Sequence, residues 1–328
     1  MGNIAHPTGR PRSTSAAEPP NPARKIPCPE APVTAAPPAA RLLLGIGLAV
    51  SAVFLFAAGD TLTKVLTERH PVERIAAVRY GVGLLILLIF VAPRAGRLLW
   101  TVKRPVLVGI RALILTLATL VIGYTLRLLP VGETIAIMYL APFAVMALAV
   151  PLLGETVTRT GWVLAALGFA GVLLIVRPGS ALNPAGVGLA LLLAASNTVF
   201  HLMTRVLTRT ETPLALLFWV NAIGASFFLV AALPTLDAPL PDLTDALMMA
   251  ALGAIFTLGH FLFGMAYREA PTSLIAPVNY LHFVWATLMG WSLFGHIPDT
   301  VTLAGMGLIL VSGSAIAVMA HVMSRPPR

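Results

Sequence analysis

Gly45-Ile-Gly-Leu-Ala49 opens one stretch of this chain, and Gly186-Val-Gly-Leu-Ala190 opens a second. The first stretch closes with Thr63-Lys-Val-Leu-Thr67 and the second with Thr204-Arg-Val-Leu-Thr208. The offset is 141 residues at both ends (186 minus 45, and 208 minus 67). Self-similarity at a fixed offset sets the architecture before any single element is assigned. We therefore expect one structural unit used twice.

The same offset recurs through the rest of the chain. The matched positions are Gly123 and Gly264, Arg127 and Arg268, Pro130 and Pro271, Tyr139-Leu140 and Tyr280-Leu281, and Gly154 and Gly295. The duplication therefore covers most of the sequence.

The composition indicates a membrane protein. Hydrophobic residues make up 58% and charged residues 11%, and the mean hydropathy is +0.89, whereas soluble proteins are roughly 45–50% apolar and about 25% charged. The apolar residues form blocks of about 20, the length at which a helix crosses a bilayer. We therefore predict an all-α polytopic protein whose surroundings are a lipid bilayer.

The net charge and the cysteine content limit which partners, metals and cofactors the protein is expected to bind. The net charge of +9 fits basic cytoplasmic loops, so nucleic acid is not expected as a partner. Cys28 is the only cysteine, which excludes an intrachain disulfide and a cysteine-based metal site. His201, His260 and His282 have no metal-ligand spacing. No metal and no cofactor are expected.

Residues 1–41 differ from the rest because they are rich in Pro, Ala and Ser. Such a segment has little to bury, so we expect a disordered cytoplasmic tail. A transit peptide and an extension from a misassigned start codon are the alternatives. A secretory signal is disfavoured because the apolar run begins only at Leu42.

Ten apolar segments follow, each long enough to cross a membrane. They are 42–63, 72–92, 105–126, 131–153, 160–176, 185–204, 214–233, 244–266, 272–294 and 300–321. The first repeat is predicted to span 42–177 and the second 185–321, with a cytoplasmic C-terminal tail at 322–328.

Lys and Arg set the expected orientation. With the N-terminus in the cytoplasm, fifteen of the 22 lie in cytoplasmic segments and five outside, while Arg79 and Arg111 lie within spans. This bias predicts that both termini are cytoplasmic. Because each repeat holds five segments, the second repeat must enter the membrane from the opposite side. Inverted repeats are typical of secondary transporters, whose site lies at mid-membrane where the halves meet.

Two matched polar stripes lie on the first span of each repeat. Phe56, Asp60 and Lys64 are spaced four residues apart, as are Asn197, His201 and Arg205, again at the offset of 141. Side chains at this spacing share one helical face. They predict a substrate or proton path lined by Asp60 and His201. A local ion pair between Asp60 and Lys64 is the alternative.

Other polar side chains inside the spans also need a reason, because ionisable groups there are costly. Arg79 and Arg111 have no acid within four residues. They suit an anionic substrate group or a structural partner such as Asp60 or Glu133. Glu133 also suits the first turn of a helix without any further role.

Several ring-bearing residues complete the candidate site. His260 and His282 are candidates for the path or for ordinary hydrogen bonds between helices. Tyr139, Tyr280 and Trp285 lie centrally in their segments, where they could stack on a flat substrate or simply pack in the core.

Small residues mark the fifth and tenth segments as scaffold. Glycines that allow close helix packing recur there, at Gly161, Gly168, Gly171, Gly305, Gly307 and Gly313. This face could also serve a homodimer.

At this point the motifs resemble a known family. Leu128-Leu129-Pro130-Val131-Gly132-Glu133-Thr134-Ile135-Ala136, Tyr139-Leu140-Ala141-Pro142, Leu152-Leu153-Gly154-Glu155 and Gly168-Phe169-Ala170-Gly171-Val172 resemble the EamA domain of the drug/metabolite transporter superfamily. Ala270-Pro271, Tyr280-Leu281, Phe294-Gly295 and Gly305 look like its second copy. The resemblance covers residues 42–320 and implies ten transmembrane helices in two inverted five-helix repeats.

A finer resemblance points to one branch, which includes S-adenosylmethionine uptake and riboflavin transporters. It rests on Lys64-Val65-Leu66, Pro71, Arg79, Arg111, Gly259-His260, Ala276-Pro277 and Tyr280. The chain departs from the pattern at His296, where the second half often has Glu, and at His282, where a small or apolar residue is expected.

The expected function is secondary transport of a small organic metabolite across the bacterial inner membrane by alternating access, not enzymatic catalysis. The expected substrate-binding residues are Asp60, Lys64, Arg79, Arg111, Tyr139, Asn197, His201, His260, Tyr280 and Trp285. An exporter of amino acids, metallophores or drugs is the first alternative, and a channel or scaffold is another. An intramembrane enzyme is disfavoured, because the sequence has no His-Glu-x-x-His motif and Asp60 is the only aspartate away from the first residues of a membrane segment.

Overall fold

A computed structural model describes residues 1–2, 39–153, 157–177, 181–270 and 272–323 of the chain. The chain divides into residues 1–36 and residues 37–328, and the described helices all belong to the second unit. The predicted tail at 1–41 and the C-terminal tail at 322–328 therefore lie almost entirely outside the described residues. No strand occurs in the described part of the chain, so the predicted all-α fold is confirmed.

The first repeat is built from five helical spans with short interruptions. Its elements are α1 (Ala39–Thr67), α2 (Val72–Ile86) with the π-helical turn η1 (Leu87–Val91), α3 (Ala92–Ala95) and η2 (Gly96–Leu99), then α4 (Pro105–Leu128), α5 (Val131–Met138), α6 (Leu140–Leu153) and α7 (Arg159–Val176).

The second repeat follows the same order. Its elements are α8 (Pro184–Leu207), α9 (Pro213–Ala231) with η3 (Leu233–Thr235), α10 (Leu243–Glu269), α11 (Thr272–Asn279), α12 (Leu281–Phe294) and α13 (Thr300–Met323). Prolines begin α4, α8 and α9, where a missing N–H costs nothing. Thr212 and Asp242 cap α9 and α10 through their side chains.

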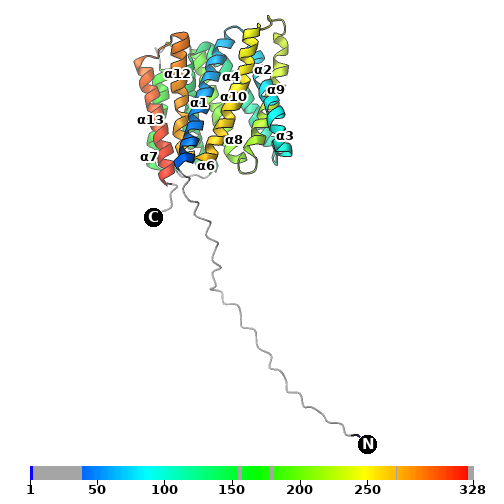
Figure 1. The fold of residues 1–328 in the computed structure, drawn as a ribbon. Helices are drawn as coiled ribbons and strands as arrows, with labels where there is room; N and C mark the ends of the chain where they lie inside the picture. Colours follow the sequence, from blue (N-terminus) through cyan, green and yellow to red (C-terminus); the bar gives the residue numbers. More distant parts are fainter. Residues whose placement is uncertain (3–38, 154–156, 178–180, 271, 324–328) are drawn as a thin grey trace. The chain divides into compact units, whose positions relative to one another are not determined.

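Nine helical stretches of the described residues are long and apolar enough to cross a membrane. Residues 272–294 supply the tenth predicted segment as two shorter helices, α11 and α12. Five spans carry each repeat, so α1 and α8 enter the bundle from opposite ends (Figure 1). We call the end that carries Lys64 and the α1–α2 connection the Lys64 end, and the opposite end the Arg268 end.

Two spans are broken at matched positions, which the sequence analysis did not predict. The segment 131–153 divides at Tyr139 into α5 and α6, and 272–294 divides at Tyr280 into α11 and α12. Pro142 offers no N–H to the carbonyl of Met138, and Pro277 lies inside α11. The prolines explain why apolar segments of full length do not form single helices.

Helix packing repeats across the two halves. α1 packs against α10 and α4 packs against α8, which are matched pairs, and α2 packs against its own match, α9. Figure 1 shows α1 and α10 side by side. The core cluster lies around the broken spans and includes Ile135, Ile137, Phe143 and Phe283.

α7 and α13 form a separate, closely packed pair, also seen at one side of Figure 1. A Cβ on Gly171 would lie 2.6 Å from the carbonyl oxygen of Gly305, and one on Gly305 would lie 2.5 Å from that of Gly171. The predicted small-residue packing therefore occurs within the chain, between these two helices.

Candidate functional site

A hydrogen bond between two titratable side chains joins the two repeats inside the bundle. Asp60 on α1 accepts from His282 on α12, with 3.0 Å between Oδ2 and Nε2. Both residues are buried, at 5% and 7% exposure. A buried carboxylate is stable only with a partner, and here the partner lies 222 residues away in the other repeat. The pair therefore couples the position of α1 to that of α12.

Aromatic rings line this pair on the side of α10. The ring of Phe56 lies 4.9 Å from that of His260 and 6.2 Å from that of His282, measured between centroids. Phe256 stacks on Phe56 at 6.2 Å. His260 keeps exposed surface although its ring lies against Phe56.

The two helix breaks meet at the same place. Tyr139 and Tyr280 lie with centroids 5.0 Å apart, and the Tyr139 hydroxyl donates to the backbone carbonyl of Asn279. The Tyr139 ring also lies 6.2 Å from that of His282. The matched tyrosines therefore contact each other where the two inverted repeats meet.

Arg79 on α2 brings a cation to this cluster without an acid partner. Its guanidinium carbon lies 3.6 Å from the centre of the Phe256 ring and 5.2 Å from that of Tyr80. Its N–H groups make no hydrogen bond to any residue that the structure describes, so the alternative of a structural ion pair with Asp60 or Glu133 is wrong. Asp60 and His260 lie within electrostatic range of it. A planar donor group with unused N–H bonds suits a carboxylate or phosphate.

Arg111 lies apart, between α4 and α8. Its Nε donates to the Thr204 hydroxyl at 2.7 Å, and its guanidinium lies 4.3 Å from the centre of the Phe200 ring. His201 is exposed beside Phe200, with ring centroids 5.5 Å apart. Arg111 of α4 and the rings of Phe200 and His201 on α8 therefore form a second cationic and aromatic group, between one helix of each repeat.

Three predicted site residues are not brought to either group. Lys64 donates to the carbonyl oxygens of Leu126 and Leu129, at 2.6 and 3.0 Å, and so caps the end of α4. It does not pair with Asp60, so that alternative is wrong. Asn197 donates to Leu193 on its own helix. Trp285 packs edge-on against Phe54, at 5.4 Å.

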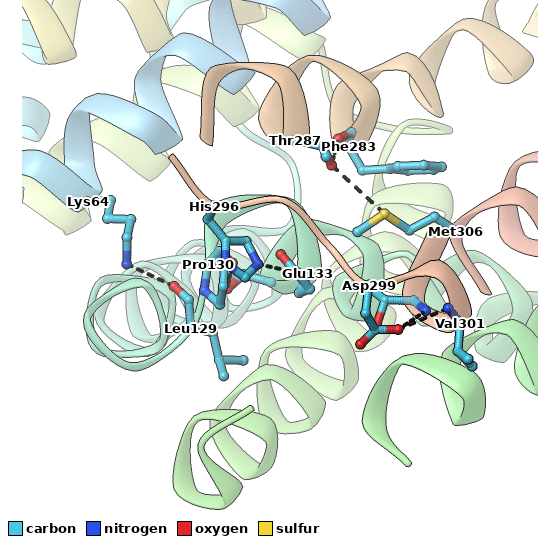
Figure 2. Close-up of polar contacts among 12 residues, drawn as sticks. Lys64, Leu129, Pro130, Glu133, Phe283, Thr287, His296, Asp299, Val301 and Met306 are labelled. Atoms are coloured by element: carbon cyan, nitrogen blue, oxygen red, sulfur yellow. Dashed lines mark hydrogen bonds and ion pairs between the residues drawn. The ribbon is translucent and has the colours of Figure 1, made fainter. Parts of the chain in front are cut away.

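Glu133 lies at the Lys64 end and makes a second bond across the repeats. Its Oε1 lies 2.7 Å from Nε2 of His296, in the loop between α12 and α13 (Figure 2). Glu133 is buried, and its Oε2 has no hydrogen-bond partner. Figure 2 also shows Lys64 reaching Leu129 beside this pair. Glu133 therefore does more than begin a helix.

His282 was a candidate for the path or for a hydrogen bond between helices but was not among the expected substrate-binding residues, and His296 was noted only as a departure from the pattern. Their pairing partners, Asp60 and Glu133, lie in the other repeat, and no spacing along the chain reveals such contacts. Both histidines depart from the family pattern, and that departure was the available signal. Phe256 and Phe200 carried no signal beyond an apolar helix position.

Two hollows of about 640 Å³ and about 250 Å³ lie away from the Asp60–His282 pair. The first is lined by α4 and α9, and the second by α4, α6 and α8, mainly with Leu, Val, Ile and other apolar residues. Neither is lined by a predicted site residue. Their linings suit acyl chains better than a polar solute.

A family model described as the EamA-like transporter family matches residues 43–177 and again residues 184–318. The chain belongs to the EamA-like transporter family. The family and the transporter names of its relatives identify a multi-pass membrane transporter rather than an enzyme.

Curated relatives of this EamA protein are named for different substrates. The pseudopaline exporter CntI of Pseudomonas aeruginosa is 25% identical and covers 83% of this chain and 95% of its own. The S-adenosylmethionine uptake transporter of Rickettsia bellii is 26% identical, with 81% and 91% covered. The riboflavin transporter of Rhizobium johnstonii is 29% identical, with 61% and 65% covered. The predicted superfamily is thereby confirmed.

A solved crystal structure shares the fold. It superposes with a TM-score of 0.62 at 19% identity, over 88% of this chain and 99% of that chain. At this identity the likeness concerns the fold alone.

Proposed function

We propose that this EamA protein moves a small organic metabolite across the bacterial inner membrane by alternating access. The observation that carries the proposal is the Asp60–His282 pair, which is buried and joins the inverted repeats next to the unpaired Arg79. Inverted-repeat transporters bind their substrate where the repeats meet, at discontinuous helices. The breaks at Tyr139 and Tyr280 meet there.

The chemistry of this place favours a substrate with both a carboxylate and a flat ring. Arg79 offers unused donors, and the neighbouring rings of Phe56, His260 and Tyr139 offer stacking surfaces. Arg–carboxylate bonds are charge-assisted and directional, and aromatic stacking adds about 0.5–1.5 kcal/mol for each ring pair. The names of the relatives, which include S-adenosylmethionine uptake, riboflavin transport and pseudopaline export, support this size class of metabolite.

The remaining predicted site residues are proposed in different roles. Asp60, Arg79, Tyr139, His260 and Tyr280 line the central site, and Arg111 with His201 lines its approach from α8. Lys64, Asn197 and Trp285 support the surrounding helices. Both termini lie in the cytoplasm, as the distribution of Lys and Arg favours, so the Arg268 end is the cytoplasmic end.

A binding screen tests the proposal. Purified protein is heated with S-adenosylmethionine, riboflavin and single amino acids, and the midpoint of unfolding is followed. A ligand at 100 times its Kd stabilises the folded state by about 2.7 kcal/mol. We expect one class to stabilise the wild type but not the Asp60→Asn or Arg79→Gln variant. Asp299→Asn is the matched control, since Asp299 is bonded to Arg177 and Thr302 in the α12–α13 loop. If the ligand still raises the midpoint of unfolding of Asp60→Asn and Arg79→Gln, the substrate does not bind at the Asp60–His282 pair.

A further inference from the structure

Two matched arginines occupy the last turns of matched helices, and only one of them is engaged. Arg127 ends α4 and Arg268 ends α10. Arg127 donates from Nε to the carbonyl oxygen of Thr67 at 2.6 Å and from Nη2 to that of His70 at 2.9 Å. It therefore ties the end of α4 to the end of α1 and to the connection that follows. This contact lies at the Lys64 end.

Arg268 does not repeat this contact at its own end. The offset of 141 residues carries Thr67 to Thr208 and His70 to Glu211, just after α8. Arg268 is exposed, and it makes no hydrogen bond or ion pair with any residue in the described ranges. The guanidinium of Arg268 and the carbonyl groups of Thr208 and Glu211 are all present, but no hydrogen bond joins them in this conformation.

Packing of whole helices shows the same asymmetry. α1 packs against α4, whereas the matched pair α8 and α10 has no comparable packing among the described residues. α5 packs against α12 at the Lys64 end, and a Cβ on Gly132 would lie 2.3 Å from the Thr287 hydroxyl. The matched halves α6 and α11 lack comparable packing at the Arg268 end, as far as the chain is described. The bundle is therefore closed at the Lys64 end and splayed at the Arg268 end.

Other matched contacts are made in both halves at once. α1 with α10 corresponds to α8 with α4, and α2 with α10 corresponds to α9 with α4. His70 bonds to Asp245 near the start of α10, and the matched Glu211 accepts from the backbone N–H groups of Lys103 and Arg104 at the start of α4. These contacts do not distinguish the two ends, so they hold parts that move together. The approach of α1 to α4 and of α5 to α12 is instead made at the Lys64 end alone, without a comparable matched contact at the Arg268 end among the described residues.

We propose that Arg268 is the latch of the opposite state. When the Arg268 end closes, its guanidinium donates to the carbonyl oxygens of Thr208 and Glu211, as Arg127 does to Thr67 and His70, and Arg127 releases its own carbonyls. This inference rests on the proposed alternating access. The terminal carbonyls of a helix lack partners within the helix and carry the negative end of its dipole, so they attract a cation. An arginine fork can reach two of them from two nitrogens.

Paired spin labels test the latch directly. In a Cys28→Ser background the chain has no cysteine, so pairs can be placed at will. One pair replaces Glu68 and Leu128 at the Lys64 end, and the matched pair, offset by 141, replaces Arg209 and Glu269 at the Arg268 end. The distances between labels are measured by pulsed electron paramagnetic resonance on the full chain in lipid.

The wild type is expected to show a short and a long distance for the 209/269 pair, with the short one equal to the closed distance of the 68/128 pair. Hydrogen bonds to charged groups contribute roughly 1.5–3 kcal/mol, so Arg268→Gln should lower the ratio of the short-distance to the long-distance population by about tenfold or more. Arg268→Lys should lower this ratio less, and Arg127→Gln should raise it. Arg159→Gln is the control, since Arg159 is also exposed at the Arg268 end but lies on α7.

Two results would overturn the latch: an Arg268→Gln variant whose distances match the wild type, or a wild type whose 209/269 pair is only ever long. Transport by the same proteins in liposomes separates the two proposals. If the wild type carries a solute and Arg268→Gln changes neither rate nor distances, the latch alone fails. If the distances respond as expected but no solute moves in either direction, the latch stands and the transport assignment fails.

Discussion

At the scale of single residues, the molecule places its charges in two different ways. Two arginines near helix ends pair with acids, Arg69 with Asp245 at 3.2 Å and Arg177 with Asp299 at 2.9 Å. The backbone N–H of Thr302 and then the Arg177 guanidinium hold the pKa of Asp299 below its usual value. Arg79, in contrast, is held only by the faces of aromatic rings. An arginine inside a membrane bundle without an acid is costly unless a ligand uses it.

Removing the Arg79 charge should therefore weaken binding more than it weakens the fold. For a carboxylate ligand identified in the screen, Arg79→Gln should raise Kd by about 10- to 100-fold, which corresponds to roughly 1.5–3 kcal/mol for bonds to a charged group. Arg79→Lys should give an intermediate loss, because an ammonium keeps the charge but not the planar fork. Calorimetric titration measures both. Arg94→Gln, at a residue bonded only to Phe90 on its own span, is the control; an Arg79→Gln protein that binds like this control would contradict the assignment.

The Glu133–His296 pair offers a second test at this scale. His296→Glu places a second carboxylate beside the buried carboxylate of Glu133. Like charges raise the pKa of one carboxyl in the folded state. The resulting loss of stability should be largest at neutral pH and should shrink as the pH falls and a proton is taken up. His296→Gln should show a small loss that does not vary with pH in this way. Thermal unfolding from pH 5 to 8 compares them, and equal pH profiles would argue against a close contact.

At the scale of elements, the proposed transport cycle divides the bundle into a moving part and a fixed part. α7 and α13 pack backbone to backbone through Gly171 and Gly305. Neither helix contributes a residue to the Asp60–His282 pair or to the ring cluster. The spans that meet at Tyr139 and Tyr280 are instead each interrupted between two helices. This division fits the proposed transport cycle, in which α1, α4, α8 and α10 change their approach.

A pair of glycine substitutions measures the packing of the fixed part. Gly→Ala stabilises an exposed helix position by about 1 kcal/mol through propensity alone. Gly307→Ala should show such a gain, because a Cβ there meets nothing within 4 Å. Gly305→Ala should instead destabilise by about 1–3 kcal/mol, since its Cβ would lie 2.5 Å from the Gly171 carbonyl oxygen. Reversible unfolding in mixed micelles gives both values, and equal stability of the two variants would mean that α7 and α13 are not in contact.

At the scale of the whole molecule, the orientation of the bundle follows from Lys and Arg and can be checked in cells. In a Cys28→Ser background, Asp237→Cys places a thiol in the connection before α10 and Arg97→Cys places one in η2. A thiol reagent that cannot cross membranes should label the cysteine at 237 in intact cells and the one at 97 only after lysis. Labelling in the reverse order would place both termini outside and would exchange the two ends of the transport cycle.

The sequence predicted the duplicated architecture well, because a fixed offset and apolar length survive in one chain without any structure. It did not predict the breaks at Tyr139 and Tyr280, since hydropathy is continuous through both. It also missed the partners of Asp60 and Glu133, because those partners lie in the other repeat and only the fold brings them near. The local pair of Asp60 and Lys64, the alternative that their spacing suggested, does not form, because the free carbonyl groups at the end of α4 lie within reach of Lys64.

The central claim is that a solute passes between the repeats at the Asp60–His282 pair. The most direct measurement is solute movement in liposomes loaded with S-adenosylmethionine, riboflavin or an amino acid mixture, with the gradient imposed in each direction. The account predicts saturable movement of one class by the wild type and by Asp299→Asn, and at least tenfold slower movement by Asp60→Asn. Wild-type protein that moves no solute, or an Asp60→Asn variant that moves it at the wild-type rate, would contradict the account.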